Sequence, residues 1–281
     1  MTGMGRLIFI GTGLMGGDWI TTRGIEAARE VDFLFAEFYT SYIGDEGVKR
    51  LENILGRRIV RLSRDEVEMK ERLFKYLEDG DVGLLVGGDP MAATTHVELR
   101  LEAERRGHRT DVVYGVSIFS AAPSSVGLQH YKFGRVVSVP WVSEKFMPRS
   151  VLEGIEGNLR CGLHTLLLLD LKDGEGFMSV NECLRTLLKL EERHEMGVVN
   201  EETLVVGAAR IGDPTECIKG GALSEMLEEN FGPPLHVVVI PGRLHFVEEE
   251  ALRTIAGVRD DVLERWKNKI ESFCPKGPTP S

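Results

Sequence analysis

The chain has 281 residues, of which 42% are hydrophobic and 28% charged, a composition typical of a soluble globular protein with one large domain or two modest ones. Its 34 Lys and Arg residues against 44 Asp and Glu residues give a net charge of -10. This acidic balance argues against binding nucleic acid through bulk attraction to phosphate. The densest basic run, residues 105–109, ends a helical pattern, where cations suit the helix dipole, so we interpret it as a solvated helix end.

The cysteines, the histidines and the hydropathy predict a cytoplasmic protein without metal. Four cysteines are scattered without CxxC spacing, so we expect no structural disulfide and no cysteine-based zinc site. The histidines show no metal-ligand spacing either. No secretory leader precedes the first apolar run, and no run approaches the ~20 apolar residues that span a bilayer, so we expect no membrane partner.

Short apolar runs alternate with amphipathic stretches along the chain, which predicts an α/β fold. Several apolar runs lack polar alternation, as strands covered on both faces do. In chain order, the predicted strands are residues 6–11, 31–37, 82–87, 111–115, 135–140, 163–171, 203–210 and 235–242. The predicted helices between them are residues 21–30, 66–80, 94–107 and 179–197.

A change of pattern near Gly115 predicts two α/β domains. The first, residues 1–114, is a run of strand–helix units with glycine loops. The second, residues 115–260, has longer connections, and we expect it to hold a mixed, partly antiparallel sheet. Residues 261–281 are expected to form a terminal helix and a frayed tail, because the prolines and glycine of "FCPKGPTPS" cannot hold a helix.

The segment Gly11–Gly17 follows a predicted strand and matches G-x-G-x-x-G, the dinucleotide-binding fingerprint. In that motif the third glycine lies in the first turn of a helix, whose N-terminus receives the pyrophosphate. Here residues 17–20 intervene, and the first good helix cap is Thr21 or Thr22. We therefore interpret this segment as a glycine loop that lets backbone approach a ligand, and not as an NAD(P) site.

A second glycine loop, "GGDP" at residues 87–90, leaves another predicted strand. Glycines at the carboxyl end of a strand remove side chains from the crevice where open α/β sheets bind ligands. Pro90 biases Asp89 toward an extended conformation. The Asp89 carboxylate would then either pair with a cationic ligand group or make a turn or helix cap. A third small-residue turn, residues 114–125, leads us to expect three loops that converge on one cleft.

Six motifs together resemble the diphthine synthase family, part of the tetrapyrrole-methylase-like class of S-adenosylmethionine-dependent methyltransferases. They are "IGTGL" (10–14), "EFYTS" (37–41), "GGDPMAATTH" (87–96), "GVSIFSA" (115–121), "GLQHYKFG" (127–134) and "GLHTLLLLDLK" (162–172). The resemblance runs from about Leu7 to Gly257. One departure is Trp19, which stands where the family usually has an acidic residue before an Ile-Thr pair, and it bears on the local shape of the first loop.

The resemblance implies S-adenosylmethionine as the cofactor, bound in a cleft between the two α/β domains. The family's cofactor contacts fall, position by position, on Leu14, Asp89, Ala92, Ser117, Ile118, Leu169, Ile211 and His236. The apolar members would supply walls for adenine and ribose, and Asp89 would face the amino group or the sulfonium. For His236 the residues alone also allow a core histidine satisfied by backbone.

The implied reaction is successive methylation of the amino group on a histidine of translation elongation factor 2 that carries a 3-amino-3-carboxypropyl group. Glu37, Tyr39, His96 and Asp170 lie in family-like motifs near strand ends and are the candidates to accept or orient the amine proton. The resemblance also implies a homodimer. Two alternatives are a tetrapyrrole or corrinoid methyltransferase of the same fold and a non-catalytic nucleotide-binding module, and the specific strings above favour neither.

Overall fold

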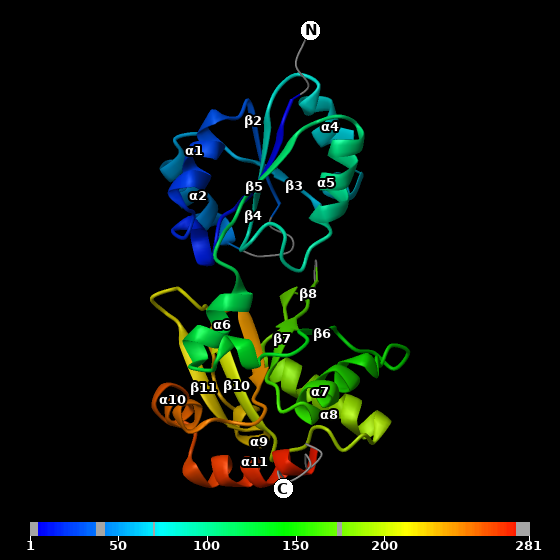
Figure 1. Cartoon of the computed structure of the whole chain (residues 1–281), viewed down its shortest axis with the longest axis vertical. Helices are drawn as coiled ribbons and strands as arrows, with labels where there is room; N and C mark the ends of the chain where they lie inside the picture. Colours follow the sequence, from blue (N-terminus) through cyan, green and yellow to red (C-terminus); the bar gives the residue numbers. More distant parts are fainter. Residues whose placement is uncertain (1–4, 38–42, 70, 173–175, 274–281) are drawn as a thin grey trace, which may run out of the picture. The chain divides into compact units, whose positions relative to one another are not determined.

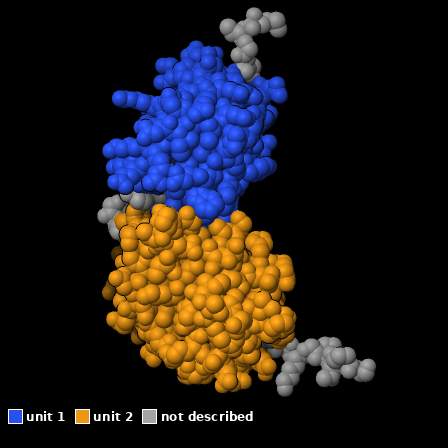
Figure 2. All heavy atoms as spheres, turned by 90° about the vertical axis from the view of Figure 1, so that its left-hand side faces the viewer, with its two compact units in different colours: residues 1–118 blue, residues 119–281 orange. Residues whose placement is uncertain are grey.

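The computed structural model describes residues 5–37, 43–69, 71–172 and 176–273. The chain divides into two compact units, residues 1–118 and 119–281, and each is described by itself (Figures 1 and 2). In the described part of the chain, each unit contains one five-stranded sheet with helices packed on it. This is the α/β fold that the alternating pattern predicted.

The first unit is built on a parallel sheet of order β3-β2-β4-β1-β5. Its strands are β1 (Leu7–Gly11), β2 (Phe33–Glu37), β3 (Val60–Leu62), β4 (Val82–Val86) and β5 (Thr110–Val113). Its helices are α1 (Thr22–Glu30), α2 (Gly44–Leu55), α3 (Arg64–Met69), α4 (Glu71–Leu77) and α5 (His96–Arg105). Because the strands are parallel, their carboxyl ends lie along one edge of the sheet.

Helices cover both faces of this sheet, which explains why its inner strands β1, β2 and β4 are almost wholly apolar. Alternate residues of β1 point to opposite faces: Ile8 and Ile10 pack in the core that includes side chains of α1 and α2. Leu7 and Phe9 pack in the core on the other face, with side chains of α4 and α5. Figure 1 shows the same division, with α1 and α2 on one side and α4 and α5 on the other.

The second unit holds a mixed sheet of order β11-β10-β12-β7-β6, in which β6 and β7 are parallel and the other pairs antiparallel, as predicted. Its strands are β6 (Val137–Val139), β7 (Thr165–Leu169), β10 (Leu204–Ala209), β11 (Cys217–Ala222) and β12 (His236–Ile240), with the short pair β8 (Leu171–Lys172) and β9 (Gly176–Phe177). Its helices are α6 (Ile118–Val126), α7 (Ser150–Arg160), α8 (Val180–His194), α9 (Leu223–Met226), α10 (Phe246–Ala256) and α11 (Asp260–Phe273).

Each predicted strand and helix overlaps an observed element. The predicted helix 66–80 corresponds to α3 and α4, which flank residue 70, outside the described residues. The tail predicted to fray, residues 274–281, also lies outside them. No helix formed by the described residues combines the length and apolar character that crossing a bilayer requires.

Candidate active site

Three turns that leave neighbouring strands of the first sheet meet through their glycines. The backbones of Gly13 and Gly88 pair, with Gly13 N 3.1 Å from Gly88 O and Gly88 N 2.8 Å from Gly13 O. A Cβ on Gly11 would lie 2.6 Å from Gly115 N, and one on Gly115 would lie 2.2 Å from Gly88 O. The loops after β1, β4 and β5 therefore converge, as predicted, through a backbone contact that only glycine permits.

The first of these turns delays the start of the following helix. Residues 15–17 form a short 3-10 turn, and α1 begins only at Thr22, with the Thr21 side chain accepting a hydrogen bond from Gly24 N at 3.0 Å. The helix N-terminus is thus separated from the glycines, unlike in a dinucleotide-binding turn. Trp19 packs against the turn, since a Cβ on Gly13 would lie 2.4 Å from Trp19 Cβ.

The second turn is organised by the Asp89 carboxylate. Its Oδ1 accepts a hydrogen bond from Met91 N at 2.9 Å, which is the turn role that the sequence left open. Asp89 and Ala92 are both half-buried. A Cβ on Gly88 would meet no atom nearer than Val116 O at 4.0 Å, leaving aside its chain neighbours, so space remains beside Gly88 in this turn. A charged oxygen, small neighbours and open backbone at a strand end fit the cationic, nucleoside-containing cofactor that the resemblance implies.

The predicted cofactor residues form two groups, one in each unit. Leu14, Asp89, Ala92, Ser117 and Ile118 lie in the three converging turns or begin the helix after them. The other three lie at one end of adjacent strands in the second sheet. Leu169 ends β7 and His236 begins β12, where Val237 pairs with Leu168. Ile211 follows β10, in which Ala209 pairs with His236.

Backbone groups satisfy both ring nitrogens of His236. Its Nδ1 accepts from Val180 N at 3.1 Å, and its Nε2 lies 3.0 Å from Pro233 O and 3.1 Å from Gly232 O. Burial lowers the pKa of His236, against the raising effect of those two carbonyls. The ring is the backbone-satisfied core histidine that the sequence also allowed, so we assign it no contact to a cofactor through its imidazole.

The four candidates for handling the amine proton have different surroundings. Glu37 and His96 are fully buried and come together, with 3.3 Å between Glu37 Oε1 and His96 Nε2. Asp170 is half-buried, and its Oδ2 accepts from Trp141 N at 3.1 Å. Tyr39 lies outside the described residues. The structure therefore assembles one pair from this set.

Sequence reasoning missed the role of Arg210, at the end of β10. Its guanidinium is buried and donates to the carbonyl oxygens of Thr215, Phe231 and Pro233. Its backbone adopts a left-handed conformation, with φ of 53°. Arg210 thus fastens the loop that carries Ile211 to the segment before β12. The only sequence signal was a single charge at the end of an apolar strand.

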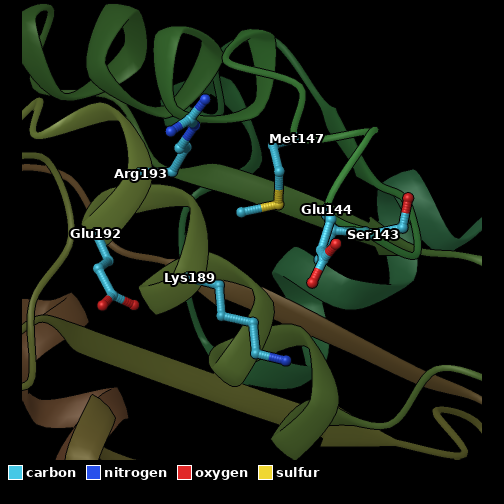
Figure 3. A pocket seen from close by; sticks show the side chains of 7 residues that line it. Ser143, Glu144, Met147, Lys189, Glu192 and Arg193 are labelled. Carbon is cyan, nitrogen blue, oxygen red and sulfur yellow. The ribbon is translucent and has the colours of Figure 1, made fainter.

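An open pocket of about 640 Å³ lies in the second unit, and none of the predicted site residues lines it (Figure 3). Side chains of α8 line one part of it and the segment before α7 lines another. The lining residues are Val142, Ser143, Glu144, Met147, Lys189, Glu192 and Arg193. Its mixed charges give it no distinct chemical preference, and we assign it no role in the reaction.

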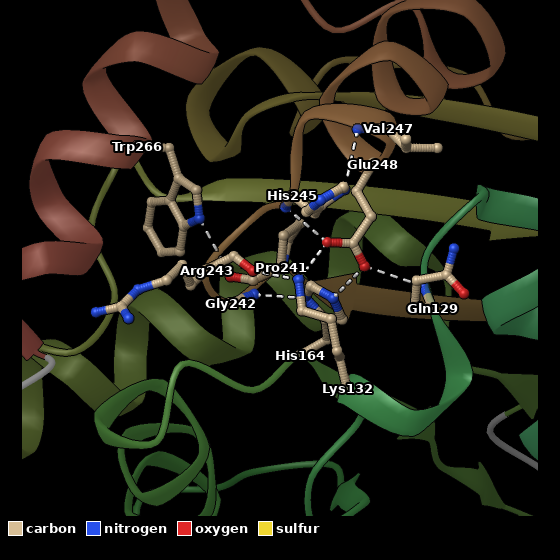
Figure 4. A network of polar contacts seen from close by, with 10 residues as sticks. All are labelled: Gln129, Lys132, His164, Pro241, Gly242, Arg243, His245, Val247, Glu248 and Trp266. Atoms are coloured by element: carbon tan, nitrogen blue, oxygen red, sulfur yellow. Dashed lines mark hydrogen bonds and ion pairs between the residues drawn. The ribbon is translucent and has the colours of Figure 1, made fainter.

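The sequence analysis also did not predict a second buried pair, His164 and Glu248 (Figure 4). His164 Nε2 lies 3.0 Å from Glu248 Oε1, and His164 Nδ1 accepts from Gly242 N at 2.8 Å. Glu248 further accepts from Lys132 Nζ and from the backbone N–H groups of Gln129 and His245. This network ties α10 to the residue that precedes β7 and to the segment after α6, and all of it lies within the second unit.

Comparison with known proteins identifies the family. Residues 6–225 match the family model of Tetrapyrrole (Corrin/Porphyrin) Methylases. Diphthine synthase of Methanothermobacter thermautotrophicus is 40% identical over 260 residues, covering 92% of this chain and 98% of that protein. The diphthine synthase of Methanosarcina mazei is 39% identical over 263 residues, with the same coverage of 92% and 98%.

Solved structures agree. One, described as a crystal structure of diphthine synthase, is 33% identical with a TM-score of 0.83 and covers 94% of this chain and 99% of its own. A structure described as a putative diphthine synthase from Entamoeba histolytica is 33% identical with a TM-score of 0.82, and covers 90% of this chain and 98% of its own. The chain therefore belongs to the diphthine synthases of the tetrapyrrole methylase family, which are S-adenosylmethionine-dependent methyltransferases.

Proposed function

We propose that this enzyme methylates, in successive steps, the amino group of the 3-amino-3-carboxypropyl-modified histidine of translation elongation factor 2. The observation that carries the proposal is the 40% identity to a diphthine synthase over 92% of the chain. The three converging glycine turns support it, because they offer backbone and a carboxylate where α/β sheets bind ligands.

Residues of both groups are the proposed contacts to the cofactor. Bound S-adenosylmethionine supplies an electrophilic methyl group on a sulfonium. In the first unit, Asp89 faces the cationic part, and Leu14, Ala92 and Ile118 supply apolar contacts. Ser117 supplies a polar one. In the second unit, Leu169 and Ile211 complete the apolar walls, and His236 contributes through its main chain.

The protein's part in the reaction is alignment and control of one proton. An amine attacks only in its neutral form, and a site that excludes water favours that form. Holding the nitrogen in line with the transferred methyl group removes most of the entropic cost of the encounter. Among the candidates named above, we favour Asp170 to accept or orient the amine proton, because it is a half-buried carboxylate next to Leu169, one of the proposed cofactor residues.

Turnover is expected only with elongation factor 2 that already carries the aminocarboxypropyl group, because unmodified histidine has no primary amine. Each transfer requires exchange of the spent cofactor, so partly methylated species should appear early and then convert to the trimethyl form. Mass spectrometry of the modified peptide over a time course measures this.

Two outcomes would contradict the substrate assignment. Label from S-adenosylmethionine that reaches another residue, or unmodified factor, would exclude the modified histidine as the acceptor. Methylation of a corrinoid or porphyrin in place of elongation factor 2 would favour a tetrapyrrole methyltransferase, the activity for which the wider family is named. Cofactor binding without any transfer would favour a nucleotide-binding module.

We also expect a homodimer of about twice 31.3 kDa in solution. Large apolar side chains remain exposed on the second unit, among them Tyr131 at 79% and Phe246 at 72%. Exposed apolar surface of this kind marks interaction sites. Light scattering across micromolar concentrations measures the mass, and a constant value near 31.3 kDa would rule the dimer out.

A further inference from the structure

Glu37 and His96 are buried titratable residues that no step of the proposed function uses. Their side chains are 0% and 1% exposed. Glu37 ends β2, and His96 begins α5. Because Glu37 pairs with Val86 at the end of the parallel neighbour β4, the end of β2 lies beside the turn that leads from β4 to α5.

In a neutral His96 ring, the hydrogen bond made by one nitrogen determines whether the other nitrogen is a donor or an acceptor. His96 Nδ1 lies 2.9 Å from Pro90 O, and a carbonyl oxygen only accepts, so Nδ1 carries a proton. In a neutral imidazole, Nε2 is then a bare acceptor. This nitrogen lies 3.3 Å from Glu37 Oε1 and has no hydrogen bond to any described residue.

A neutral His96 beside an ionised Glu37 would place two acceptors face to face in a buried site, which is costly. One additional proton removes the conflict. On Nε2 it makes an imidazolium–carboxylate pair, and on Glu37 it makes an acid that donates to a neutral ring. Either arrangement gives the contact between Nε2 and Oε1 one donor and one acceptor, and these two residues together then carry no net charge.

We propose that Glu37 and His96 hold one shared proton and thereby act as a positioning pair for the turn that carries Asp89 and Ala92. The proposal rests on the proposed function, since it takes those two residues as cofactor contacts. The His96 ring spans the turn: Nδ1 holds Pro90 O, and Glu37 holds the opposite side of the ring.

The segment between Pro90 and His96 needs such support. Ala93 within it has a left-handed backbone with φ of 53°, a conformation that costs free energy in a residue other than glycine. The cap of α5 is weak as well, since Thr95 makes no capping hydrogen bond with its side chain. The hydrogen bond between His96 Nδ1 and Pro90 O therefore stabilises the conformation of this turn.

Nitrogen NMR of the ligand-free protein, labelled with 15N in its histidines, tests the shared proton. In Glu37→Gln the amide donates to Nε2 and carries no titratable proton. We expect the His96 Nε2 resonance to move toward that of an unprotonated nitrogen in this variant. A wild-type Nε2 resonance that is already that of an unprotonated nitrogen without a hydrogen bond would overturn the shared proton.

His108 is a matched internal control. Its Nδ1 lies 3.0 Å from Gly5 O and its ring lies 6.2 Å from that of Phe74, much as His96 lies 6.0 Å from Phe9. No carboxylate of the described residues pairs with the His108 ring. Its Nε2 resonance should therefore be that of a bare nitrogen in both proteins, and should not respond to Glu37→Gln.

Calorimetry with S-adenosylhomocysteine tests the positioning role. Glu37→Leu and His96→Phe keep much of the volume but lose the polar contacts, and we expect affinity to fall about tenfold. Glu37→Gln should stay within about threefold of the original affinity, and His108→Phe should do the same. Thermal unfolding checks that each variant folds.

The outcomes separate the two proposals. Unchanged affinity in both Glu37→Leu and His96→Phe would overturn the positioning role. If one of them fails to fold, the other decides, together with Glu37→Gln. A wild-type protein that binds no S-adenosylhomocysteine would overturn the assignment of the cofactor site, while the NMR result would still decide whether the pair holds a proton.

Discussion

Replacing Asp89 with asparagine is expected to lower the affinity for S-adenosylmethionine ten- to hundredfold without disturbing the fold. The asparagine oxygen can still accept the hydrogen bond from Met91 N, so the turn is kept and only the charge is lost. A charge-assisted contact contributes roughly 1.5–3 kcal/mol, which corresponds to about that change in affinity. Isothermal calorimetry measures it.

Two further variants make this result specific. Asp89→Ala removes the turn bond as well, so its affinity should be lower still. Asp81→Asn is the control, because Asp81 lies at the opposite end of the same strand, where it pairs with Arg6. Equal affinity of Asp89→Asn and the wild type for S-adenosylmethionine would mean that Asp89 stabilises the turn and does not bind the cofactor through its charge.

The largest effect on stability is expected for Glu248→Gln, at about 3 kcal/mol less free energy of unfolding. Glu248 is 0% exposed and accepts hydrogen bonds from two charged or polar side chains and two backbone N–H groups. The amide has one acceptor where the carboxylate has two, and Lys132 loses its buried counter-charge. Denaturation in urea, followed by a signal from the second unit, measures the loss.

Glu250→Gln provides the matched control on the same helix. Glu250 is 72% exposed and its ion pair with Arg253 spans 3.5 Å, so the change should stay within about 0.5 kcal/mol. A loss for Glu248→Gln no larger than that for Glu250→Gln would mean that the network adds nothing to stability.

The same network predicts how stability depends on pH. Burial alone would raise the pKa of Glu248, but the bonds from His164, Lys132 and two backbone N–H groups hold it below its usual value. A lowered pKa in the folded state contributes stability above the unfolded value of about 4.3, and this is lost as pH falls below it. In Glu248→Gln the decline below pH ~4.3 should be smaller.

His164 acts in the same direction at a higher pH. Burial lowers its pKa, although Glu248 opposes this effect, so the folded protein keeps the ring neutral. The unfolded chain takes up that proton first, near pH ~6.5, and stability should begin to fall as pH drops through that value.

The sequence predicted most strands because both faces of each sheet are covered, which makes central strands apolar without interruption. The two strands of the large sheets that it missed, β3 and β11, both lie at sheet edges. Two of the three residues of β3 are exposed, and β11 contains Gly220 and Gly221, so neither has the apolar pattern. An edge strand is defined by the partner it finds and only weakly by its own residues.

The same limit applies to the site. Sequence patterns of a few residues were sufficient to predict the Asp89 turn and the helix cap at Thr21, because each depends on a hydrogen bond between residues two or three positions apart. Glu37 and His96 were recognised separately, but nothing in the sequence paired them. His164 and Glu248 are 84 positions apart, and only the folded chain brings the residue before β7 into contact with α10.

The position of β12 bears on how much of the chain is needed for folding. The match to the family model ends at residue 225, but β12 lies between β10 and β7 in the second sheet. A chain cut at that boundary would lose an inner strand, leave two new open edges, and remove the carboxylate that His164 contacts. The part of the protein that the family model matches is therefore smaller than the part that folds cooperatively, and truncations designed from that match would yield aggregating fragments.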